Sequence, residues 1–322
     1  MTRSIPDLSK RGPYPVGALQ TEIPSPHDPL DPDRRLPTEI WYPGQADASR
    51  QGELPHDAPH PMGLLHRASK GLEPHASPAT LIAFSHGNSG LRQQSTFLTT
   101  HLASWGFVVV APDHVGNTFG EMLALTDEDE RREVHRRARQ QRPHDIVTSI
   151  RALLDEGHER DRLPPLGATK VGVLGHSYGG WTSLKIPALE RRVRALGCLA
   201  PVSEPFVGRK AFEPGELPVA DPIETLILAG RDDVLVDLDT SIRPLVERLG
   251  MAARLEIIEG ADHFHFCDGI ELLHKMHENN PRPHQLRPTR PLTELKGEAE
   301  MHALLNERVT RFFLDTLGGV ES

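Results

Sequence analysis

The sequence has 322 residues, with 36 Lys and Arg against 45 Asp and Glu, and a formal net charge of −9 at pH 7. This length suits one large α/β domain or two ordinary ones, and we predict a single domain over residues 1–322. The acidic balance disfavours nucleic acid or an anionic membrane surface as the main partner.

The cysteine content and the apolar runs indicate in which cellular compartment the protein is expected. The two cysteines, Cys198 and Cys267, lie far apart and indicate no disulfide framework. Residues 1–10 lack the apolar core of a signal peptide, and the longest strongly apolar run, 107–111, is too short to span a bilayer. We therefore expect a cytoplasmic protein without a membrane span.

The first part of the chain predicts few regular elements. Residues 1–16 are interrupted by prolines and are expected to be irregular. A strand is predicted over 36–42, at an edge of the sheet because Pro37 cannot donate to a neighbouring strand. Residues 43–78 are rich in Pro, Gly, His and Ala, and we interpret them as a surface excursion, either a plain insertion or a segment that flanks a site.

Two continuous apolar runs follow, at 80–84 and 107–111, and the residues between them from 91 to 105 have helical spacing. Apolar runs without polar alternation are typical of parallel strands that are covered on both faces. This part of the chain therefore predicts a strand, a helix and a second strand.

A charged segment over 121–141 is predicted to be helical. Acidic and basic residues are interleaved in it, which favours a solvated helix with i,i+4 ion pairs over a basic binding face. A small lid helix over residues 118–142 is the alternative interpretation. Pro143 is expected to begin a separate amphipathic helix, because proline suits the first turn of a helix.

The segment from Gly175 to Gly179 reads Gly-His-Ser-Tyr-Gly and follows the apolar run 171–174. A helix is predicted directly after it, over 181–190. Strand, Gly-x-Ser-x-Gly and helix in this order indicate a nucleophile elbow, in which Ser177 takes a positive φ and the two glycines let strand and helix approach. The flanking elements favour this interpretation over a chance match.

Further strands are predicted at 193–200, 223–229 and 255–258, and acid and base candidates follow the last two. Functional groups of α/β sheets gather at the carboxyl ends of strands, and a serine nucleophile needs a base that a third group orients. His263 is the predicted base. Asp233 is favoured as the acid because Leu235 and Val236 follow at the usual offset, with Asp232 as the alternative.

His265 is a weak competitor for the role of base, since two residues on in an extended chain it would point the other way. A metal pair of His263 and His265 lacks further ligands at suitable spacing, so no metal is predicted. Residues 264–297 are mixed, and a long closing helix is predicted over 298–317. Alternating strands and helices predict a mostly parallel sheet with helices on both faces.

The tetrahedral oxyanion of acyl transfer needs hydrogen-bond donors. The backbone N–H of Tyr178, directly after the nucleophile, is one predicted donor. The loop Ser85-His-Gly-Asn88 follows an earlier strand, and Gly87 allows close backbone approach, so the N–H of Asn88 is the other. His86 is interpreted as a structural hydrogen-bonding residue. A plain turn is the alternative for this loop.

Several motifs resemble the α/β-hydrolase family, and in particular its dienelactone hydrolase-like and platelet-activating-factor acetylhydrolase-like branch. They are Tyr14-Pro-Val-Gly17, Ile40-Trp-Tyr-Pro43, Phe84-Ser-His-Gly-Asn88, Trp105-Gly-Phe-Val-Val-Val-Ala-Pro-Asp-His114, Arg142-Pro-His-Asp145 and Gly175-His-Ser-Tyr-Gly-Gly180. The resemblance implies an α/β-hydrolase fold and a serine esterase. Ser177 occupies the place where true dienelactone hydrolases carry a cysteine.

Three functional hypotheses follow. The first is a serine hydrolase that cleaves a small-molecule carboxylic ester through an acyl-enzyme on Ser177 and needs no cofactor. The second is an amidase, peptidase or lactonase that uses the same triad. The third is a non-catalytic binding protein on the same fold, which the presence of all three triad residues disfavours.

Overall fold

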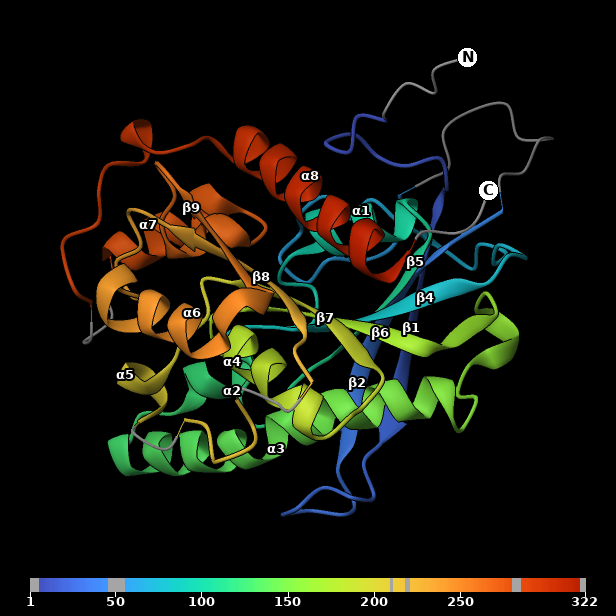
Figure 1. The fold of residues 1–322 in the computed structure, drawn as a ribbon, viewed down its shortest axis with the longest axis horizontal. Coiled ribbons are helices and arrows are strands. Elements are labelled where there is room, and N and C mark those ends of the chain that lie inside the picture. The colour runs from blue at the N-terminus through green and yellow to red at the C-terminus, as the bar shows by residue number, and fades with distance from the viewer. Residues whose placement is uncertain (1–5, 46–55, 209–210, 218–220, 280–284, 319–322) are drawn as a thin grey trace.

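The computed structural model describes residues 6–45, 56–208, 211–217, 221–279 and 285–318. Nine strands in these ranges form one sheet in the order β3-β1-β2-β5-β4-β6-β7-β8-β9 (Figure 1). In chain order they are β1 (Val16–Pro24), β2 (Arg35–Pro43), β3 (Ser69–Lys70), β4 (Ala79–Ser85), β5 (Phe107–Pro112), β6 (Leu166–His176), β7 (Val193–Leu199), β8 (Glu224–Gly230) and β9 (Ala253–Ile258).

The sheet is mostly parallel, as predicted. β1 and β2 form an antiparallel pair, β2 and β5 form another, and the neighbouring strands from β5 to β9 are parallel. The prediction that the strand around Pro37 lies at a sheet edge is wrong, because β2 lies between β1 and β5. Pairing with β5 begins at Thr38, so Pro37 precedes it and interrupts no hydrogen bond of that ladder.

Helices cover both faces of the sheet (Figure 1). They are α1 (Thr96–Ser104), α2 (Phe119–Ala124), α3 (Glu128–Leu154), α4 (Tyr178–Lys185), α5 (Glu204–Val207), α6 (Arg243–Leu249), α7 (Ile270–Asn279) and α8 (Glu298–Leu317). Buried side chains of α1 and α8 form one core against the sheet, and those of α3, α4 and α6 form the other. The fold is therefore the predicted α/β-hydrolase architecture.

Among the described residues, no helix has the length and apolar character to cross a membrane.

The predicted helix boundary at Pro143 is wrong. α3 continues through this proline, and residues 118–142 comprise α2, a short connection and the first half of α3. A proline inside a helix removes one backbone hydrogen bond and costs about 3 kcal/mol. Arg142 and Asp145, on either side of it, are fully buried and hydrogen-bonded to side chains of other elements, which holds the helix in place.

Part of the predicted surface excursion 43–78 packs into the core, while residues 46–55 lie outside the described ranges. His66 is 3% exposed and accepts a hydrogen bond from the indole N–H of Trp41 at 2.7 Å. Ala58 and Ala68 are buried as well. Part of the described portion therefore belongs to the core on the α1 side of the sheet, while Leu65 stays 63% exposed.

Candidate active site

Ser177 lies at a sharp turn between β6 and α4, with φ 56° and ψ −116°. This positive φ matches the prediction for a nucleophile elbow. A Cβ on Gly175 would lie 2.2 Å from the carbonyl oxygen of Gly179, and a Cβ on Gly179 would lie 1.9 Å from that of Ser85. Both positions therefore exclude any side chain, because the turn brings three backbone segments into contact.

The side chains of Ser177, His263 and Asp233 form one chain of hydrogen bonds. Nε2 of His263 lies 2.9 Å from Oγ of Ser177, and Nδ1 of His263 lies 2.8 Å from Oδ2 of Asp233. The other carboxylate oxygen of Asp233 accepts from the backbone N–H groups of Leu235 and Val236, both at 2.8 Å. A carboxylate fixed in this way accepts a hydrogen bond from Nδ1–H, which leaves Nε2 free to accept the serine hydroxyl proton.

Asp232 and His265, the two sequence alternatives, have other partners. Asp232 accepts from the guanidinium of Arg290 at 2.8 Å and from the N–H of Gly260 at 3.0 Å. Nδ1 of His265 accepts from the N–H of Asp262 at 3.1 Å. Burial lowers the pKa of His265 to about 4, so the ring is neutral near pH 7. Both side chains connect loops to each other rather than contacting Ser177.

The peptide between Gly87 and Asn88 lies beside the serine. A Cβ on Gly87 would lie 3.5 Å from Cβ of Ser177. The Gly87 carbonyl accepts from Nδ1 of His86 at 2.7 Å and from the N–H of Gly90 at 3.2 Å. These two bonds orient the same peptide unit that carries the Asn88 N–H.

His86 has the structural role that the sequence predicts. Its Nε2 accepts from the backbone N–H of His114 at 3.0 Å, so the ring proton is on Nδ1 and is donated to the Gly87 carbonyl. Burial lowers the pKa of His86 well below its ordinary value, which keeps the ring neutral. The second predicted donor, the N–H of Tyr178, stands in the first turn of α4, where backbone N–H groups have no acceptor within the helix.

Gln94 and His176 join the two sides of the site, and sequence reasoning missed both. The Gln94 carbonyl oxygen accepts from the N–H of Gly87 at 2.9 Å, and its amide nitrogen lies 2.8 Å from Nδ1 of His176. Nε2 of His176 then lies 3.0 Å from the backbone carbonyl oxygen of His263. His176 belongs to the elbow motif, but no local pattern around Gln94 indicates this role.

A second Ser–His–Asp arrangement lies inside the protein. Oγ of Ser85 is 2.8 Å from Nε2 of His114, and Nδ1 of His114 is 2.7 Å from Oδ2 of Asp145. Burial lowers the pKa of His114 well below its ordinary value and raises that of Asp145 to about 7. All three residues are 0% exposed, whereas Ser177 is 7% exposed, so this arrangement is structural and joins the ends of β4 and β5 to α3.

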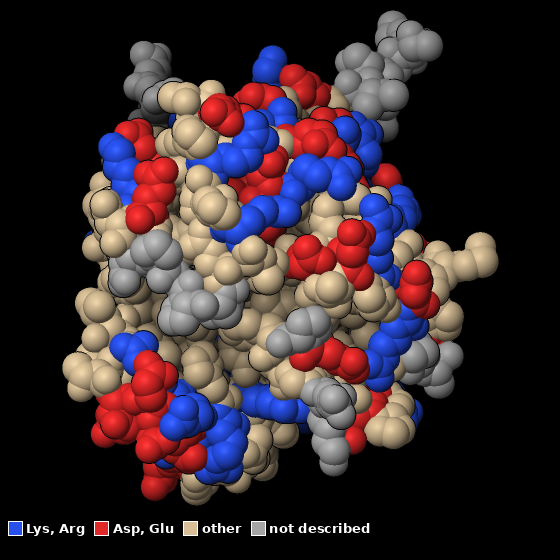
Figure 2. All heavy atoms as spheres, turned by 90° about the vertical axis from the view of Figure 1, so that its left-hand side faces the viewer, with Lys and Arg blue, Asp and Glu red and all other residues tan. Residues whose placement is uncertain are grey.

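α2, α5 and α7 follow the carboxyl ends of β5, β7 and β9 and lie on the left of Figure 1. Figure 2 shows this side of the molecule from the front. Uncharged side chains occupy much of its middle and left, with Lys, Arg, Asp and Glu concentrated above, below and along the right. This is the end of the sheet at which α/β proteins place their ligand sites.

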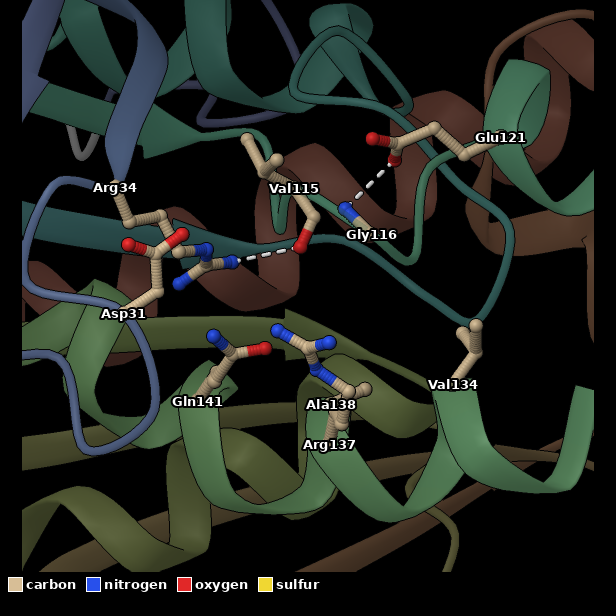
Figure 3. A pocket seen from close by; sticks show the side chains of 9 residues that line it. All are labelled: Asp31, Arg34, Val115, Gly116, Glu121, Val134, Arg137, Ala138 and Gln141. Atoms are coloured by element: carbon tan, nitrogen blue, oxygen red, sulfur yellow. Dashed lines mark hydrogen bonds between the residues drawn. The ribbon is translucent and has the colours of Figure 1, made fainter. Parts of the chain in front are cut away.

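A cavity of about 250 Å³ lies between α3 and the loop around Gly116 (Figure 3). Two lining residues are hydrogen-bonded to this loop: Arg34 donates to the Val115 carbonyl, and Glu121 accepts from the Gly116 N–H. Its lining does not include Ser177, so we do not interpret it as the substrate site. Across the described ranges, no cluster of three or more His, Cys, Asp or Glu is arranged to hold a metal ion.

A ferulic acid esterase from Streptomyces cinnamoneus has a similar structure, with a TM-score of 0.69 and 22% sequence identity over 94% of this chain and 90% of that chain. No curated protein sequence matches the chain significantly. The family model described as the dienelactone hydrolase family matches residues 72–313, which include Ser177, Asp233 and His263. The chain therefore belongs to the dienelactone hydrolase family, within the α/β-hydrolase superfamily.

Proposed function

We propose that the protein is a serine esterase that hydrolyses small-molecule carboxylic esters through an acyl-enzyme on Ser177. The observation that carries this proposal is the hydrogen-bond chain from Asp233 through His263 to Ser177, with links of 2.8 and 2.9 Å. Membership of a hydrolase family supports it. The first step is attack of the Ser177 oxygen on the ester carbonyl carbon, while Nε2 of His263 takes the hydroxyl proton.

The carbonyl oxygen then carries a negative charge, which the N–H groups of Asn88 and Tyr178 stabilise by hydrogen bonds. Asp233 stabilises the imidazolium of His263 and keeps its orientation. The tetrahedral intermediate collapses, the alcohol leaves with the proton from His263, and Ser177 remains acylated. In the second half, His263 takes a proton from water as its oxygen attacks the acyl carbon. The second tetrahedral intermediate then collapses, His263 returns the proton to the Ser177 oxygen, and the acid is released.

Hydrolysis of p-nitrophenyl acetate, compared between the wild type and Ser177→Ala, tests the proposal. We expect kcat to fall by several orders of magnitude in the variant, because removing a triad nucleophile has this effect in serine hydrolases. A fluorophosphonate probe should label the wild type and not the variant. Wild-type rates in Ser177→Ala would exclude the mechanism, and a wild type that neither turns over nor reacts with the probe would indicate a binding protein.

The substrate class needs a separate experiment. We expect p-nitrophenyl acetate to be hydrolysed far faster than p-nitroacetanilide, its amide counterpart, and esters with short acyl chains to be preferred over long ones. Comparable kcat/KM for ester and amide would favour the amidase alternative.

A further inference from the structure

Asn88 is held by its side chain as well as by its backbone. Its Oδ1 accepts from Nδ2 of Asn117 at 2.9 Å, and Oδ1 of Asn117 accepts from Nη1 of Arg142 at 2.8 Å. We propose that Asn117 is a positioning residue for the oxyanion site, which ties the Asn88 donor to the buried guanidinium of Arg142. This inference rests on the proposed function.

Asn117 belongs to a loop that is fixed independently of Asn88. It is 0% exposed, and the two residues before it are hydrogen-bonded to side chains from outside the loop. The Val115 carbonyl accepts from Arg34 at 2.8 Å, and the Gly116 N–H donates to Glu121 at 2.8 Å (Figure 3). The Asn117 side chain therefore offers Asn88 a rigid donor rather than a mobile one.

Arg142 decides the orientation of both amide groups. A guanidinium only donates hydrogen bonds, so the oxygen of Asn117 must face it and the NH₂ group must face Asn88. Burial lowers the pKa of Arg142 to about 10, so the group is still charged near pH 7. The hydrogen bonds therefore run in one direction only: Arg142 donates to Asn117, and Asn117 donates to Asn88.

Arg142 also contacts the side chain of Tyr178, whose backbone N–H is the other proposed donor. Its guanidinium carbon lies 4.6 Å from the ring centroid of Tyr178, and its Nε donates to Oγ1 of Thr182 at 3.2 Å. Its Nη2 donates to the carbonyl of His86 in the loop that leads to Asn88. One buried cation thus contacts α4, which begins at Tyr178, and, through Asn117, the Asn88 side chain. Donors fixed before the reaction avoid reorganisation in the transition state.

The test is Asn117→Asp, assayed with p-nitrophenyl acetate. The variant keeps an oxygen for Arg142 but presents an acceptor to the Asn88 oxygen in place of a donor. We expect kcat to fall about 10- to 100-fold with KM within about threefold, since oxyanion donors act mainly on the transition state. Binding of a trifluoromethyl ketone, which forms a tetrahedral oxyanion on the serine, should weaken by a similar factor.

Asn279→Asp is the matched control, because Asn279 is exposed at the end of α7 and the substitution makes the same chemical change. It should keep wild-type kcat. Asn88→Ala removes the acceptor and retains the backbone N–H, so it should reproduce the fall in kcat. Adding Asn117→Asp to Asn88→Ala should then cause no further loss, because the contact is already absent.

Wild-type kcat in folded Asn117→Asp would overturn the proposal, and so would additive effects in the double variant. If Asn117→Asp does not fold, the kcat of Asn88→Ala is the deciding measurement. A wild-type kcat for Asn88→Ala would then contradict the proposal. Failure of the proposed function is distinguishable, since it appears as full activity in Ser177→Ala. An inactive Ser177→Ala beside a fully active Asn117→Asp refutes only the role of Asn117.

Discussion

The ring of His176 donates from Nε2 to the backbone carbonyl oxygen of His263, 3.0 Å away. This bond leaves Nδ1 of His176 as an acceptor for Gln94, whose own carbonyl oxygen holds the Gly87 N–H. A single hydrogen-bonded path therefore joins the loop of the proposed base to the loop of a proposed oxyanion donor.

Replacing Gln94 by methionine should lower kcat for p-nitrophenyl acetate about tenfold or more. Methionine has a similar length but removes both hydrogen bonds, so the two loops lose their connection, and small misplacements at a reacting centre have large effects on rate. Gln94→Glu keeps an acceptor for Gly87 and should lose less activity. Equal activity of Gln94→Met and the wild type would show that the path is dispensable.

Asp233→Asn and Asp232→Asn form a matched pair of neighbouring substitutions. Asp233→Asn should lower kcat by about four orders of magnitude, because an amide does not stabilise the imidazolium and permits the wrong tautomer of His263. Asp232→Asn should change kcat less than tenfold, since that side chain binds Arg290 and Gly260. Steady-state kinetics of both variants check this, and a reversed order would assign the acid to Asp232.

Gly179→Ala should destabilise the protein by about 1–3 kcal/mol or more, as overpacking does in well-packed interiors. The added methyl group would lie 1.9 Å from the carbonyl oxygen of Ser85, so β4 and α4 must move apart. Gly120→Ala in α2 is the control, because its methyl group would meet no atom within 4 Å. Urea unfolding of both variants measures the difference, and similar stabilities would contradict the close approach at the elbow.

Two buried histidines, His101 and His265, should each contribute a loss of stability in acid between about pH 6.5 and pH 4. Burial lowers the pKa of His101 and of His265 from 6.5 to about 4. As the pH falls, the unfolded chain binds these protons before the folded protein does. The contribution of the two neutral rings to the free energy of unfolding is therefore fully present above pH 6.5 and decreases toward pH 4. Each ring contributes about 2–3 kcal/mol to this loss.

Urea unfolding at several pH values gives the slope of stability with pH. His101→Gln serves as the matched variant, because the glutamine amide can replace the bond of Nε2 to the Leu8 carbonyl at 2.9 Å without titrating. Its stability should depend less on pH than that of the wild type between pH 6.5 and pH 4. An unchanged slope would mean that His101 is protonated in the native state at its ordinary pKa.

The sequence by itself predicts the elements whose signals are local. The apolar runs that become β4, β5, β7 and β8 lack polar alternation, and the Gly-x-Ser-x-Gly turn around Ser177 carries its own steric requirement. β1 was missed, because Val16 to Pro24 contains Gly, Gln, Thr and Glu and gains its strand conformation from pairing with β2. The sequence also did not predict α7 (Ile270–Asn279), because the prolines that follow it made the segment 264–297 look irregular.

Tertiary structure decided which neighbouring side chain takes which partner. Asp232 and Asp233 are chemically identical, and only the direction of the backbone after β8 turns Asp233 toward His263 and Asp232 toward Arg290. Gln94 likewise acquires its place because the fold brings the loop before α1 beside His176 at the carboxyl end of β6. A hydrogen bond between residues 82 positions apart, such as that of Gln94 to His176, has no local sequence pattern, since its geometry is set by the packing of the whole sheet.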